Sequence, residues 1–157
     1  MRATSICFAF LTAVAAGVPA PAAADPSFIQ PMASAPADPD FENGRKAVEI
    51  KDWKGAIDYF SRSIGRDPKN ANAQNYLGYS YRKSGNLDMA FKHYEEALRL
   101  DPSHRGAHEY LGEAYLTVNN LPKAEEHLYA LDKICFFSCE EYRDLKAAVQ
   151  EYKRTKK

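Results

Sequence analysis

Apolar residues recur at helical spacing through the middle of the chain. The first apolar stripe consists of Ala73, Tyr76, Leu77 and Tyr81. Their intervals of three and four predict one helix with a single apolar face. A second stripe at the same kind of spacing consists of Leu87, Ala90, Phe91, Tyr94, Ala97 and Leu98. Between the stripes, Gly85 suits the left-handed conformation that ends many helices, and Asp101-Pro102 stops the second stripe. The pattern therefore predicts two antiparallel helices joined by a tight turn.

This pattern repeats at an interval of 34 residues. The lines of residues in register are Gly44, Gly78 and Gly112; Ala56, Ala90 and Ala124; and Phe60, Tyr94 and Leu128. Pro68 and Pro102 form a partial fourth line, which ends with Phe136 in the third unit. An insertion in any unit would destroy the register, so one helical hairpin is expected to be stacked three times. Small residues in the glycine and alanine lines allow paired helices to approach closely where their axes cross.

The middle unit resembles the tetratricopeptide repeat family. The family pattern W-x2-L-G-x2-Y, then A-x3-F, then A and P, appears as Leu77-Gly78, Tyr81, Ala90, Tyr94, Ala97 and Pro102. Gln74 replaces the tryptophan, the third unit drifts after Ala124, and the first unit departs from the pattern in its opening helix. The resemblance implies an all-α, right-handed superhelical solenoid of three helix-turn-helix repeats, at 37–70, 71–104 and 105–138.

One further amphipathic helix is expected after the third unit. Tyr142, Leu145, Val149 and Tyr152 recur at helical spacing with charged residues on the other face. Ser138 and Glu141 have the spacing of a capping box. The last repeat of a solenoid has no neighbour to bury its apolar face. We therefore expect a capping helix over 139–154, within a repeat domain over 40–157.

The first residues have the pattern of a secretion signal. Arg2 precedes an apolar run of about thirteen residues, which is too short to span a bilayer. Small residues at Ala22-Ala23-Ala24 then predict a signal peptide over 1–24, cleaved after Ala24, and export to a bacterial periplasm. An uncleaved anchor or a chance apolar start is the alternative. Four prolines among small and polar residues predict that 25–39 is a flexible linker.

The charge balance argues against a nucleic-acid partner. Lysine plus arginine number 21, and so do aspartate plus glutamate, so the chain has no long-range positive field. A short basic tail contains Lys153, Arg154, Lys156 and Lys157. Such a tail could make a weak contact with an anionic membrane surface or cell wall, but more often it is a solubilising end.

Export would leave Cys135 and Cys139 as an even pair in an oxidising compartment, because Cys7 is lost with the signal. We expect them to form a structural disulfide at the corner where Phe136 replaces the earlier prolines. Closing so short a loop contributes about 2 kcal/mol. The alternative is a reactive thiol pair or a soft-metal site for Cu(I). The C-x3-C spacing, unlike that of thioredoxin-type enzymes, and the lack of a second cysteine pair make this alternative weaker.

No catalytic signature occurs in the sequence, so we expect no enzyme activity and no cofactor or metal. His104 and His108 are four residues apart, and His93 and His127 lie one repeat apart. Neither pair has a carboxylate in a metalloprotease motif. We interpret all four histidines as structural or surface residues.

The family resemblance implies that the first helix of each repeat lines a concave groove that binds a protein or peptide. The predicted partner-binding residues are Arg45, Asn75, Tyr79, Arg82, Lys83, Glu109 and Glu113. They would form a basic centre flanked by acidic residues, with Tyr79 as the anchor. An ordinary solvated face is the alternative. The residues with which some family members bind a C-terminal carboxylate are mostly absent, since Glu109 and Glu113 replace one pair of cations.

Overall fold

The computed structural model describes residues 38–156, which form seven α-helices and no strand. The helices are α1 (Pro39–Glu49), α2 (Trp53–Arg66), α3 (Ala71–Lys83), α4 (Leu87–Leu100), α5 (Arg105–Thr117), α6 (Leu121–Ile134) and α7 (Glu140–Thr155). The predicted signal peptide and the predicted linker up to residue 37 lie outside the described residues. No helix within 38–156 combines the length and the apolar character needed to cross a membrane.

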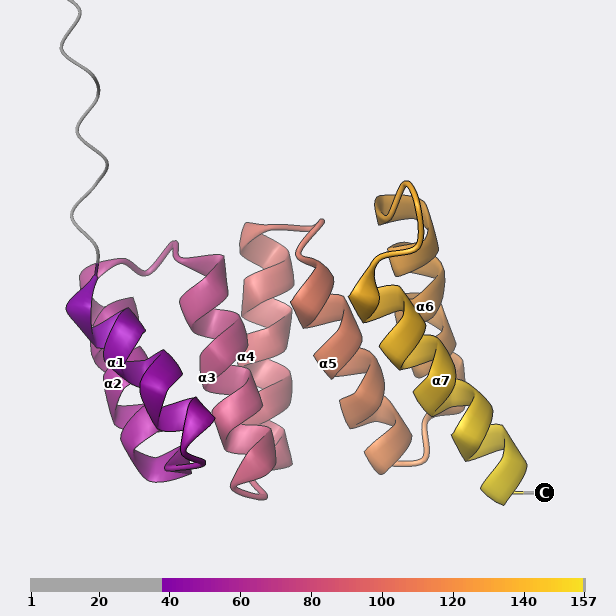
Figure 1. The fold of residues 1–157 in the computed structure, drawn as a ribbon, viewed down its shortest axis with the longest axis horizontal. Helices are drawn as coiled ribbons and strands as arrows, with labels where there is room; N and C mark the ends of the chain where they lie inside the picture. Colours follow the sequence, from indigo (N-terminus) through magenta and orange to yellow (C-terminus); the bar gives the residue numbers. More distant parts are fainter. Residues whose placement is uncertain (1–37, 157) are drawn as a thin grey trace, which may run out of the picture. The chain divides into compact units, whose positions relative to one another are not determined.

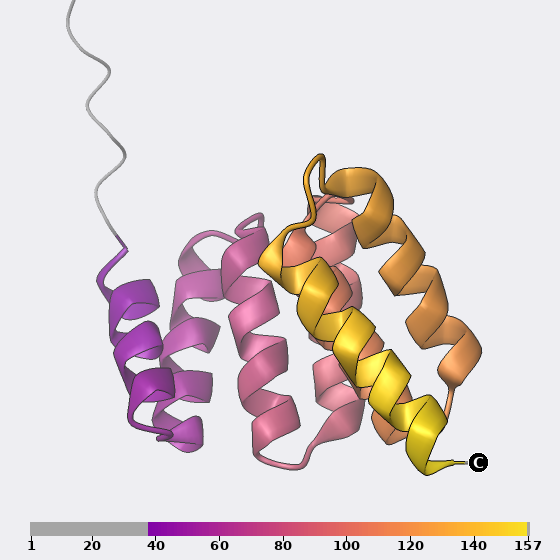
Figure 2. The same ribbon diagram turned by 45° about the vertical axis from the view of Figure 1, so that its right-hand side comes forward.

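The helices pair as the repeat predicts. α1 packs on α2, α3 on α4 and α5 on α6, and each hairpin also packs on the next one (Figure 1). The first helices of the hairpins are neighbours as well, because α1 contacts α3, α3 contacts α5, and α5 contacts α7. Figure 2 shows α7 lying along the end of the stack. The expected all-α solenoid fold is confirmed.

Side-chain caps explain where most helices begin. Asp52, Asn70, Asn86, His104 and Asn120 each accept a hydrogen bond from the backbone N–H three residues later. Asp38 caps α1 in a similar way, since its side chain accepts a hydrogen bond from the backbone N–H of Asp40, two residues later. Pro39 is the first residue of α1, so the helix begins one residue inside the segment predicted as a linker. Proline is tolerated at this position because the first N–H groups of a helix have no intrahelical acceptor.

The turn inside each hairpin has the same backbone form. Gly85 has φ +88°, and Lys51 and Asn119, which lie 34 residues before and after it, have φ +60° and +57°. In the middle turn, the N–H of Asn86 donates to the carbonyl of Tyr81 at 2.9 Å. The left-handed cap predicted at Gly85 is therefore present in all three hairpins, in two of them without glycine.

The glycine line permits close packing between helices. A Cβ atom on Gly44 would lie 2.7 Å from the Phe60 ring, and one on Gly78 would lie 2.8 Å from the Tyr94 ring. In the third unit, a Cβ atom on Gly112 would lie 2.6 Å from Leu145 of α7. Leu128, the residue in register with Phe60 and Tyr94, is only partly buried. The capping helix thus supplies the large side chain that the third unit lacks.

The predicted capping box at the start of α7 is wrong. Cys139 is the N-cap residue of α7, and its side chain makes no capping hydrogen bond. Ser138 lies outside the helix with φ +47°, and its carbonyl accepts a hydrogen bond from Arg143 at 3.4 Å. The helix therefore begins one residue later than a Ser138 cap would require. Acidic side chains in its first turn stabilise its N-terminus instead.

Candidate functional site

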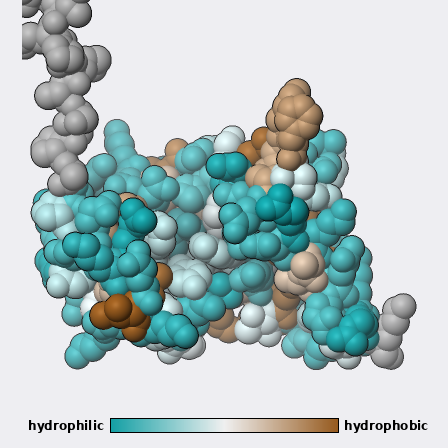
Figure 3. Space-filling view, in the orientation of Figure 1, coloured by the Kyte–Doolittle hydropathy of each residue, from teal (hydrophilic) through white to brown (hydrophobic). Residues whose placement is uncertain are grey.

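The first helices of the three hairpins and α7 together form one face of residues 38–156 (Figure 1). Figure 3 shows that this face is largely polar in the view that it presents. The predicted groove residues lie on three of these helices, α1, α3 and α5. Whether a partner binds to them stays a prediction.

Arg82 joins the helices of this face rather than pointing freely into solvent. Its guanidinium lies 2.8 Å from a carboxylate oxygen of Glu113 on α5, and its Nε donates to the Tyr94 hydroxyl at 3.4 Å. The side chain is only 14% exposed. Glu113 neutralises Arg82, so the basic centre expected from the sequence is smaller than predicted. Lys83 is the exposed cation that remains there.

Tyr79 lies in the middle of an aromatic cluster. Its ring centroid is 4.9 Å from that of Tyr110 and 6.1 Å from that of Trp53. The Lys83 ammonium lies 5.3 Å from the Tyr79 ring centroid. The ring is partly buried, so part of it is accessible from solvent. Such an aromatic side chain, held by its neighbours and still accessible, fits the anchor role predicted for it.

A hollow of about 330 Å³ lies among α3, α5 and α7. Its lining includes Asn75, Tyr76, Glu109, Tyr110, Glu141 and Asp144. The sequence pointed to Asn75 and Glu109 but to no lining residue of α7. The sequence predicts that helix as a cap for the apolar core, with charged residues on its other face. The N-terminal half of α7 instead lies beside the face of α5 that carries Glu109.

Glu109 is a buried carboxyl group in this hollow. It is 9% exposed, and it has no hydrogen-bond or ion-pair partner within 38–156. Burial raises its pKa to about 8, and the nearby carboxylates of Glu113, Asp144 and Glu141 add to the increase, whereas Arg82 opposes it. At neutral pH this pKa leaves the group mainly protonated.

Asn75 is the second buried polar side chain with an unmet hydrogen bond at this place. It is 4% exposed, and its Oδ1 has no hydrogen-bond partner among the described residues. Its amide nitrogen faces Gly106, where an added Cβ atom would lie 3.2 Å away. A buried polar atom without a partner is destabilising, so such atoms often mark a place that a ligand completes.

Arg45 lies apart from this hollow. It is exposed on α1 and lies 3.5 Å from Glu42, one turn earlier on the same helix. The basic tail is also partly neutralised, since Lys153 pairs with Glu125 at 2.5 Å and Arg154 with Glu151 at 2.6 Å. These cations are therefore less available to an anionic surface than the sequence indicates.

The histidines have structural contacts. His108 Nδ1 lies 3.0 Å from His127 Nδ1, and His108 Nε2 lies 3.0 Å from the Pro102 carbonyl. One repeat earlier, Gln74 and His93 make the equivalent contact at 2.8 Å. Within 38–156, no three histidine, cysteine or acidic side chains gather as metal ligands would.

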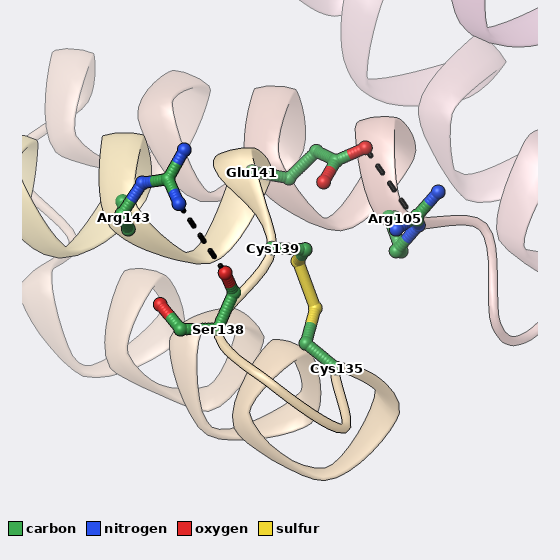
Figure 4. Close-up of a disulfide and its surroundings, with 6 residues drawn as sticks. All are labelled: Arg105, Cys135, Ser138, Cys139, Glu141 and Arg143. Carbon is green, nitrogen blue, oxygen red and sulfur yellow. Dashed lines mark hydrogen bonds and ion pairs between the residues drawn. A yellow bond between two sulfur atoms is a disulfide. The ribbon is translucent and has the colours of Figure 1, made fainter.

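Cys135 and Cys139 are bonded to each other at the corner between α6 and α7, with their Cα atoms 5.5 Å apart (Figure 4). Thiol or copper chemistry would require a free thiolate at this corner. The loop between them exposes Phe136 and Phe137, which are 90% and 86% exposed. The oxidation state of the pair in its cellular compartment stays a prediction.

The comparisons with known proteins agree on the fold. The tetratricopeptide repeat model matches residues 71–104, which are also the bounds expected for the second unit. No curated protein sequence matches the chain.

Several solved structures have a similar fold. The TPR2B domain of yeast Sti1, in complex with pHsp70, has a TM-score of 0.69 and 18% identity, and the match covers 74% of this chain and 94% of that one. The first TPR domain of Spaghetti (RPAP3), bound to the HSP90 peptide SRMEEVD, has a TM-score of 0.64 and 20% identity, with 71% and 89% covered. The Yersinia enterocolitica type III secretion translocator chaperone SycD has a TM-score of 0.67 and 16% identity, with 74% and 83% covered.

Proposed function

The chain contains a tetratricopeptide repeat and has the tetratricopeptide-repeat fold, and on this premise we propose that it is a non-catalytic adaptor. Its partner is a protein or peptide, which binds to the face formed by α1, α3, α5 and α7. The observation that carries this proposal is the hollow beside Glu109 and Asn75, next to the aromatic cluster around Tyr79. Buried groups without partners, next to a partly accessible aromatic anchor, are what an incoming chain would complete.

Two of the similar structures support this class of function. The Sti1 domain is in complex with pHsp70, and the Spaghetti domain is bound to an HSP90 peptide. Three of the last four residues of that peptide, SRMEEVD, are acidic. The hollow in this chain is itself lined by carboxyl groups of α5 and α7, which would repel such a sequence. The partner is therefore expected to differ from those of these two proteins.

We also propose that the adaptor acts in the bacterial cell envelope. The support is the signal pattern over 1–24 and the pairing of Cys135 with Cys139, which suits an oxidising compartment. Mass spectrometry of the protein recovered from its native host tests this. The mature chain is expected to begin at Asp25. A chain that retains residues 1–24 in the cytosol would contradict the proposal.

The binding face is tested by affinity purification from the native envelope with wild-type protein and the Tyr79→Ala variant. Loss of the anchor ring is expected to reduce partner recovery by at least about 10-fold. The matched control is Tyr129→Ala on α6. Tyr129 and Lys133 form the same kind of cation–π pair as Tyr79 and Lys83. The Lys133 ammonium lies 4.9 Å from the centroid of the Tyr129 ring. Equal recovery with both variants would contradict binding at the face around Tyr79.

A further inference from the structure

We propose that the hollow among α3, α5 and α7 receives a cationic side chain, lysine or arginine, from the bound partner. This inference deepens the proposed function and rests on it, because it names the chemistry of the segment that docks there. Its basis is the two buried groups, Glu109 and Asn75, because some of the other acidic residues have a local role in the fold.

Glu140 and Glu141 have such a local role. Both lie in the first turn of α7, where negative charge stabilises the N-terminus of a helix. Glu141 also lies 3.7 Å from Arg105 of α5, as Figure 4 shows. These two carboxylates would be present whether or not a ligand binds, so they give the hollow its negative potential without identifying an occupant.

Glu109 has no role of this kind. It lies in the second turn of α5, away from the end of the helix, and its side chain is nine-tenths buried without a partner in the described residues. Burial of a carboxyl group without a partner is costly. Alanine or leucine at this position would be more favourable for the stability of α5. A cationic group from a partner would supply the missing interaction.

Asn75 independently indicates the same kind of ligand. Its unpartnered Oδ1 is a hydrogen-bond acceptor, and an ionised Glu109 carboxylate accepts as well. The group that completes both must therefore donate hydrogen bonds. A lysine ammonium has three N–H donors and an arginine guanidinium has five, and neither has an acceptor. A carboxylate ligand has no donor and would be repelled.

The walls of the hollow fit the rest of such a side chain. Tyr76 and Tyr110 line the hollow together with the polar groups. Aromatic rings pack well against the aliphatic stem of lysine or arginine and attract the charged head. The volume of about 330 Å³ is at the small end of the range for ligand pockets, which suits one long side chain with some water.

Ionisation of Glu109 couples to this binding. An incoming cation favours the carboxylate and lowers its pKa from about 8, so a proton leaves the carboxyl group when the cation binds at pH 7. The charged groups that face Glu109 are Glu113 on α5, Glu141 and Asp144 on α7, and Arg82 on α3. Arg82 is the cation among them, and it is paired with Glu113.

Selection of a phage-displayed random peptide library on the purified protein tests the inference. Peptides bound by the wild type are expected to share a lysine or arginine at one position. Replacing that residue by norleucine should weaken binding by about 10-fold or more. Glu109→Gln combined with Asp144→Asn should cause a comparable loss. Glu95→Gln, which removes one exposed acidic group from α4, should leave the affinity unchanged.

Proton release on peptide binding provides a second test. If Glu109 had only a structural role, peptide binding would not release a proton from it. Calorimetry at pH 7 in two buffers of different ionisation enthalpy should show close to one proton released per peptide bound by the wild type. The Glu109→Gln variant should release none. Glutamine resembles the protonated carboxyl in shape, so this variant is expected to fold.

The outcomes separate the two proposals. Selected peptides that depend on Tyr79 but carry no shared cation would overturn the cationic inference and leave the adaptor function standing. Cationic peptides that bind equally well to the Glu109→Gln, Asp144→Asn variant would also overturn the inference. If the wild type selects no peptide above the Tyr79→Ala background, the proposed function fails as well.

Discussion

At the scale of single residues, Glu109 and Glu113 show how the same kind of side chain can have different roles. Arg82 and Glu113 neutralise each other across α3 and α5, and the ion pair holds the two helices together. Glu109, one turn before Glu113 on α5, has no such cation within the described residues. One carboxyl group therefore contributes to the fold, and the other is the group for which we propose a cationic ligand.

The elevated pKa of Glu109 gives a stability prediction. The group has a pKa of about 8 in the folded chain and about 4.5 when unfolded, so the folded state binds more protons between these values. Wild-type stability therefore falls as pH rises from 4.5 to 8. Glu109→Gln removes this loss, and the variant should be more stable than wild type at pH 9 by on the order of 4 kcal/mol.

Urea denaturation of both proteins at pH 5, 7 and 9 measures this difference. Other titrating groups are the same in both chains, so the difference in unfolding free energy isolates Glu109. The two pH profiles should diverge above pH 5. Parallel profiles would mean that Glu109 is ionised without cost and that its environment supplies a cation.

At the scale of elements, the hairpin turn shows which part of the fold is local. Its left-handed residue is Gly85 in the second unit but Lys51 and Asn119 in the first and third. A residue with a side chain is strained in this conformation, and lysine more so than asparagine. The turn forms in all three units nevertheless, because the capping hydrogen bonds and the packed helices on both sides hold it.

Glycine in place of Lys51 should therefore stabilise the chain. We expect a gain of about 1 kcal/mol in unfolding free energy for Lys51→Gly, since glycine has no Cβ to crowd the turn. Gly85→Ala is the reverse change at the equivalent position and should cost a similar amount. Thermal denaturation of the two variants checks this. A lower melting temperature for Lys51→Gly would contradict the turn geometry.

At the scale of the whole described domain, α7 does more than cover an apolar end. Leu145 is fully buried and reaches the backbone at Gly112, in the position that Phe60 and Tyr94 occupy in the earlier units. Through the same contact with α5, its acidic N-terminal half faces Glu109. The helix that closes the core therefore also completes the candidate binding hollow.

Loss of this contact should be costly. Leu145→Ala is expected to destabilise the chain by about 2–5 kcal/mol, because it leaves a cavity against Gly112. Leu128→Ala, at the partly buried position in register, should cost less. Gly112→Ala should be better tolerated in the Leu145→Ala background, because the clash is removed. A larger loss from Leu128→Ala would show that the third unit is closed by its own second helix.

The sequence by itself determined the repeat, the helices and the turn at Gly85, because these depend on spacing and on residues close along the chain. It also pointed to seven side chains of one face through the family resemblance. The tertiary structure decided which of them are free. Arg82 is paired with Glu113 because α3 and α5 lie side by side. Glu109 is buried beside Asp144 because α7 lies against α5. Pairing and burial of charge depend on distances between residues far apart in the sequence, and no periodicity encodes those distances.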